Sequence, residues 1–141
     1  MGKINMARVI LGGIVAGLVI NVVEGVMNGV ILKDQWSEAA KALGQSGAIS
    51  VKQIAAFNVW GFAAGILAIW LYAAIRPRFG PGAKTAMCAG AVVWMLAVAM
   101  ANAMMAFLHI YPLWILLTVT AVGLPELLIA SVSGAYIYKE P

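Results

Sequence analysis

The chain has 141 residues, of which 64% are hydrophobic and only 10% are charged, and its formal net charge is +4. Its mean hydropathy of +0.98 excludes an ordinary soluble domain, because a soluble surface that apolar would aggregate. The composition indicates an integral membrane protein without room for a soluble catalytic domain, and the few scattered basic residues exclude a nucleic-acid-binding patch.

Four apolar runs are each long enough to cross the roughly 30 Å hydrocarbon layer, which takes about 20 helical residues. They lie at residues 9–32, 54–75, 86–108 and 113–138. Each run carries one stripe of small or polar residues, as is typical of helices that pack together in lipid. We therefore predict an all-α integral membrane fold, an antiparallel bundle of four transmembrane helices that forms a single membrane domain over residues 1–141.

The first span carries a charge deep within its apolar run. Glu24 lies there, with Asn21 three residues before it and Asn28 four residues after it, so the three share one face of an α-helix. No Lys or Arg lies within any of the four runs to neutralise the carboxylate. An ionisable residue inside a membrane is by default a candidate functional site, so we expect this face to be turned towards protein.

The one sizeable loop follows the first span. Asp34 is predicted to cap a short interfacial helix that ends at Gly44, with Trp36 at the depth of the lipid headgroups. Ser50 and Gln53 have the spacing of a capping box, which predicts the start of the second transmembrane helix.

The later spans contribute a second carboxylate and two further amides. Glu126 lies near the middle of the last run, directly after Pro125, and Asn58 and Asn102 lie in the second and third runs. If the polar stripes converge, the amides line an entrance that opens to the outside and the two carboxylates form its floor. Burial and a second nearby carboxylate both disfavour the charged form, so we expect at least one of Glu24 and Glu126 to be protonated at neutral pH.

The orientation in the membrane follows from the positive-inside rule, which counts Lys and Arg in short loops. With the N-terminus inside, more basic residues are cytoplasmic than external, which predicts that both termini are cytoplasmic. The cytoplasmic residues are Lys3, Arg8, Arg76, Arg78, Lys84 and Lys139, and the external ones are Lys33, Lys41 and Lys52.

Several segments together resemble a known group of proteins. These are residues 71–82, which include the turn Arg76-Pro77-Arg78-Phe79-Gly80-Pro81-Gly82 and are followed by Lys84-Thr85-Ala86, the Gly-rich first span with Asn28-Gly29-Val30, and the terminal Gly134-Ala135-Tyr136-Ile137-Tyr138-Lys139-Glu140. The chain resembles a group of small uncharacterised bacterial four-span membrane proteins over nearly its whole length. This resemblance implies a multi-pass protein of the bacterial inner membrane, and it implies no catalytic residue because the group has no established activity.

Two hypotheses for the function stay open. The first is proton- or cation-linked binding or transport of a small solute, with candidate binding residues Glu24, Glu126, Asn21, Asn28, Asn58 and Asn102. The second is a non-catalytic accessory or scaffolding subunit of a larger membrane complex, in which the amides are interhelical hydrogen-bond clamps and the acids are structural.

An enzyme is not predicted, because the sequence has no histidine cluster, nucleophile-base motif or metal-ligand spacing. We expect no cofactor and no metal. The lipid bilayer is the expected partner, and the sequence leaves open a homo-oligomer or a larger membrane complex.

Overall fold

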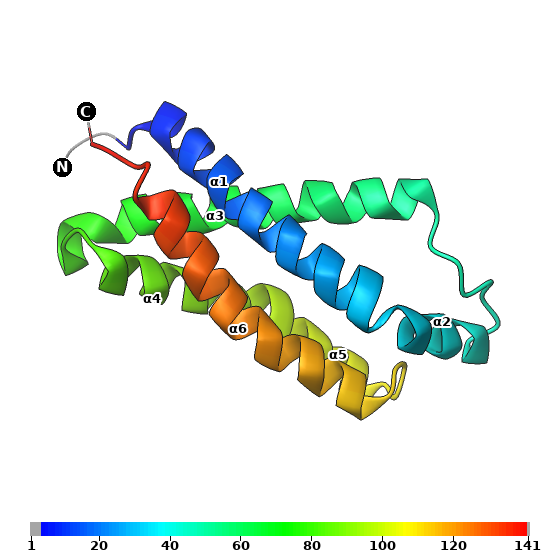
Figure 1. Cartoon of the computed structure of the whole chain (residues 1–141). Coiled ribbons are helices and arrows are strands. Elements are labelled where there is room, and N and C mark those ends of the chain that lie inside the picture. Colours follow the sequence, from blue (N-terminus) through cyan, green and yellow to red (C-terminus); the bar gives the residue numbers. More distant parts are fainter. Residues whose placement is uncertain (1–3, 141) are drawn as a thin grey trace.

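The computed structural model describes residues 4–140, which form four long apolar helices and one short helix between the first two (Figure 1). The long helices pack as a bundle, which confirms the predicted fold class. Each is long and apolar enough to cross a membrane. Lys3, which contributes to the predicted orientation, lies outside the described residues.

The first and third spans each contain a π-helical turn. The first span consists of α1 (Met6–Val26) and the π-turn η1 (Met27–Ile31), and the third consists of α4 (Ala83–Trp94), the π-turn η2 (Met95–Ala99) and α5 (Met100–Phe107). The second and fourth spans are the continuous helices α3 (Val51–Phe79) and α6 (Leu113–Ala135), and the short helix is α2 (Lys33–Ala42).

The start of α3 confirms the predicted capping box. The hydroxyl of Ser50 accepts a hydrogen bond from the backbone N–H of Gln53, and the side chain of Gln53 accepts one from the backbone N–H of Ser50. The helix then continues to Phe79, beyond the predicted end at residue 75. It includes Pro77 in its last turn, and Gly80 ends it with a φ of +83°. Gly80 can adopt this left-handed conformation without strain.

The predicted cap of the short helix is wrong. Leu32 precedes α2 as its N-cap residue, and Asp34 lies in the first helical turn instead. The reason is that η1 runs almost directly into α2, so the backbone N–H of Trp36 already donates to the carbonyl of Leu32. The predicted end is correct, since Gly44 follows the helix with a φ of +75°.

Close helix contacts lie in the half of the bundle that holds residues 4 and 140, which we call the termini end (Figure 1). Here α1 packs against α3 and α6, and α6 packs against α4. Gly12 and Gly134 bring the backbones of α1 and α6 together, and Gly65 of α3 touches the backbone of α1 at Gly13 and Gly17. Absence of side chains at these positions permits the close approach.

The opposite half, which we call the α2 end, is more open. Every residue of α3 from Val51 to Trp60 is exposed, whereas Gly61 and the turns that follow it contribute buried residues. Figure 1 shows this first third of α3 diverging from the other long helices. The buried apolar core therefore lies towards the termini end, where it includes Val9, Ile20, Ile69, Tyr72 and Leu127.

Candidate functional site

Glu24 lies in the last turns of α1, where the side chain is partly buried. The side-chain N–H of Asn28, one helical turn further on, donates a hydrogen bond to Oε2 of Glu24. The carbonyl oxygen of the same amide accepts a hydrogen bond of 2.8 Å from the indole Nε1 of Trp36. A chain of two hydrogen bonds therefore connects the carboxyl group in the first span to α2.

Trp36 fixes the orientation of the amide between these partners. An indole N–H can only donate, so it must face the carbonyl oxygen of Asn28, and the amide NH2 must face Glu24. The indole also packs edge-on against the ring of Tyr111, with the centroids 5.3 Å apart and the planes at 84°. Trp36 thus joins α2 both to the first span and to the turn before α6.

Glu126 lies in α6 directly after Pro125, and only 5% of its surface is exposed. Its helix α6 packs against α1, the helix that carries Glu24. The two acids thus come from neighbouring spans, and the convergence of their side chains in one site stays a prediction.

The remaining amides make separate contacts. The side chain of Asn21 donates to the backbone carbonyl of Asn58 over 3.2 Å, and the side chain of Asn58 donates to the carbonyl of Ile54 in its own helix over 2.8 Å. Asn102 donates to the hydroxyl of Thr120 over 2.8 Å. These bonds connect α1 with α3 and α5 with α6, so the structure does not bring all four amides to the carboxylates.

Thr120 is a polar contact point that the sequence does not single out as part of the site. Besides accepting from Asn102, it donates its own hydroxyl hydrogen to the carbonyl of Leu116, and its backbone carbonyl accepts the indole N–H of Trp94 over 2.9 Å. The sequence signal for this contact is Trp94, because an indole N–H inside a helix bundle needs a hydrogen-bond acceptor. Thr120 therefore connects both α4 and α5 of the third span to α6.

The π-turns are a second feature that residue types alone do not reveal. The turn η1 contains Asn28, and its last hydrogen bond runs from the N–H of Leu32 to the carbonyl of Met27 over 2.8 Å. The turn η2 packs against α6 through Val98, which lies against Gly123, three residues before Glu126. Short π-helical turns inside α-helices are frequent at functional sites. Here they occur in the two spans that flank α6.

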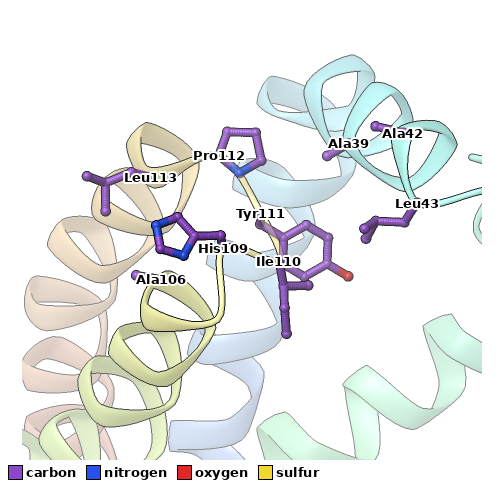
Figure 2. Close-up of a pocket in the computed structure, with 9 residues that line it drawn as sticks. All are labelled: Ala39, Ala42, Leu43, Ala106, His109, Ile110, Tyr111, Pro112 and Leu113. Atoms are coloured by element: carbon purple, nitrogen blue, oxygen red, sulfur yellow. The ribbon is translucent and has the colours of Figure 1, made fainter.

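At the α2 end, a pocket of about 420 Å³ lies between α2 and the turn before α6. Ala39, Ala42 and Leu43 line it on one side, and Ala106 together with residues 109–113 lines the other. Figure 2 shows the ring of Tyr111 extending from the turn towards Leu43. The pocket is mainly apolar and does not include the two carboxylates.

Within residues 4–140, no group of three or more His, Cys, Asp or Glu side chains could hold a metal ion. Comparison of the chain with known protein families, curated proteins and solved structures gave no match. The resemblance to small bacterial four-span proteins therefore stays a prediction. The established description is an integral membrane protein with four candidate spans.

Proposed function

We propose that this multi-pass protein binds or transports a small solute together with a proton or a cation, using Glu24 and Glu126. The observation that carries the proposal is the presence of a carboxyl group in each of two helices that pack together, α1 and α6, one of the two groups being held by Asn28. An acidic side chain in a membrane span is costly and marks a proton or ion pathway more often than a packing position. We further propose the bacterial inner membrane as its location, with both termini cytoplasmic.

The chemistry follows from the hydrogen bonds of Glu24. Its Oε2 accepts the N–H of Asn28, which leaves Oε1 to carry a proton or to contact a cation. Two neighbouring carboxylates cannot both ionise cheaply, so binding of a cation favours release of a proton from the pair. Coupling of this kind allows the movement of a cation to drive the movement of a proton, or the reverse.

The test is proton or cation movement across vesicles that contain the purified protein. Glu24→Gln keeps the shape of the side chain but has no titratable proton, and we expect it to abolish movement. Glu126→Gln is expected to reduce or abolish it as well. Glu38→Gln is the matched control, because Glu38 is exposed on α2. If the wild-type protein moves neither protons nor test cations above empty vesicles, the proposal is refuted.

A specific observation favours the accessory role as the second candidate. The first third of α3 is exposed at every residue from Val51 to Trp60 and diverges from the other helices (Figure 1). A larger membrane protein would gain contact area by packing on this segment. Purification from native membranes in mild detergent tests this role, with a photo-crosslinker at Phe57. A specific crosslinked partner that Glu24→Gln captures as well as the wild-type protein does would favour the accessory role over transport.

A further inference from the structure

A second cavity, of about 210 Å³, lies at the termini end of the bundle. It lies where the last turn of α3, the α3–α4 turn, the start of α4 and the C-terminal segment after α6 meet. Its walls include Tyr72, Arg76, Gly82 and Tyr138. At about 30 Å³ for each water molecule, the cavity has room for several waters and so for a phosphate-sized group.

Arg76 is the charged residue of this cavity, and its guanidinium group is incompletely paired. Its Nε and Nη1 atoms are buried and have no hydrogen-bond partner among the described residues. The guanidinium carbon lies 5.7 Å from the ring centroid of Tyr138, so one face of the group is covered by an aromatic ring. Buried N–H groups of an arginine without acceptors are unfavourable, and they point to an acceptor that binds from outside the chain.

Glu140 partly compensates this charge. Its Oε1 lies 2.9 Å from Nη1 of Arg76, which makes an ion pair, although the geometry is not that of a hydrogen bond. Half of the Glu140 side chain is exposed, compared with 20% of the Arg76 side chain. The carboxylate approaches from the chain end after α6 and leaves Nε free, so it is a weak internal partner that a better anion can displace.

Two neutral groups at the same cavity can add hydrogen bonds to an anion. The hydroxyl of Tyr72 accepts the backbone N–H of Gly82 over 3.3 Å, so its own hydrogen is free to be donated. Gly82 is also the N-cap residue of α4 and supplies no side-chain cap. The first N–H groups of α4 therefore have no side-chain acceptor at their N-cap, and this helix end favours negative charge.

We propose that Arg76 and this cavity bind a phosphate group, with the carboxylate of Glu140 as the internal competitor. The guanidinium fork of Arg76 matches two phosphate oxygens through adjacent N–H groups. Arg76 lies near the end of a candidate membrane span, which is the depth of lipid headgroups. An anionic phospholipid and free phosphate share this chemistry, and the experiment below separates them.

The first measurement is retention of phosphatidylglycerol and phosphatidylcholine of equal chain length by the full-length protein in detergent, read by native mass spectrometry. We expect wild-type protein to prefer the anionic lipid. Arg76→Gln is expected to lower the retention of phosphatidylglycerol by about tenfold or more, because a buried charge partner is lost. Arg78→Gln is the matched control, because Arg78 carries the same charge two residues away and is exposed.

Glu140→Gln provides the opposite test. Removal of the internal competitor is expected to raise retention of phosphatidylglycerol several-fold, without any change to Arg76. A thermal-unfolding series with inorganic phosphate distinguishes the source. Protection of wild-type protein but not of Arg76→Gln by inorganic phosphate assigns free phosphate, and protection by phosphatidylglycerol alone assigns the headgroup.

Two results would overturn the proposal. If Arg76→Gln and Arg78→Gln lowered the retention of phosphatidylglycerol equally, the lipid would be held by general surface charge and not by a specific site at Arg76. Unchanged retention in Glu140→Gln would show that its carboxylate does not compete. Circular dichroism and size-exclusion chromatography check the fold, and if Arg76→Gln does not fold, the Glu140→Gln measurement decides alone.

Discussion

The glycine contact between α1 and α3 leads to a sharp prediction for Gly65→Ala. A Cβ atom at this position would lie 2.5 Å from the carbonyl oxygen of Gly13 and 2.5 Å from the backbone nitrogen of Gly17. Both are backbone atoms, so no side chain can rotate away to relieve the overlap. The two helices would have to move apart by roughly 1 Å to restore ordinary van der Waals contact.

The size of the effect follows from two opposing terms. Overpacking of a close contact costs about 1–3 kcal/mol, and the short distances to backbone atoms place Gly65→Ala in the upper part of that range. Replacement of glycine inside a helix by alanine returns about 0.5–1 kcal/mol of backbone entropy. We therefore expect a net destabilisation of about 1–2 kcal/mol.

Gly25→Ala is the matched control, because it makes the same chemical change in a transmembrane helix. A Cβ atom at Gly25 meets nothing within 4 Å, so only the helix-propensity gain of about 0.5–1 kcal/mol remains. The assay is reversible unfolding of the full-length protein in mixed detergent micelles, followed by circular dichroism. Equal unfolding free energies for Gly65→Ala and Gly25→Ala would refute the α1–α3 packing. Loss of self-association in Gly25→Ala alone would instead identify a homo-oligomer contact.

Three further changes test other contacts. Trp36→Phe removes the indole donor to Asn28 and should cost about 1 kcal/mol, seen as faster amide hydrogen exchange throughout α2; unchanged exchange would contradict the docking of that helix. Ser50→Ala removes the capping box and should cost about 0.5–2 kcal/mol, with faster exchange confined to the first turn of α3; a uniform change across the helix would argue against a local cap. Asn102→Leu should cost about 0.6 kcal/mol, and a double-mutant cycle with Thr120→Val should show coupling; additive effects would exclude the hydrogen bond.

The four-span fold could be predicted because length and hydropathy determine it almost alone. A run of about 20 apolar residues has no other stable position than a membrane helix. The capping box at Ser50 was equally readable, since both of its partners lie within one turn. The start of the short helix α2 could not be read in this way. The π-turn η1 keeps the backbone helical up to Ile31, so the N-cap residue is Leu32 and not Asp34.

Partner choice among distant residues could not be read from the sequence. Gly13-x-x-x-Gly17 and Gly25-x-x-x-Gly29 are the same motif, yet the first pair contacts α3, whereas a Cβ atom added at either glycine of the second pair would meet no other part of the structure within 4 Å. Asn58 illustrates the same limit. It shares the polarity of the other amides, but the divergence of α3 leaves it exposed and bonded to its own helix. These differences arise from how the helices cross, which no single helix encodes.

The close packing at one end and the partly buried carboxylate at the other have a common cause. Gly65 brings α3 against α1, and Asn21 fills the remaining space against Gly61, beyond which α3 turns away. Glu24 lies in the next turn of α1, where its partly buried carboxyl group accepts a hydrogen bond from Asn28. Glu24 and the exposed residues 51–60 of α3 thus lie on the same side of the contact between Asn21 and Gly61, whereas the glycine contacts lie on the other side.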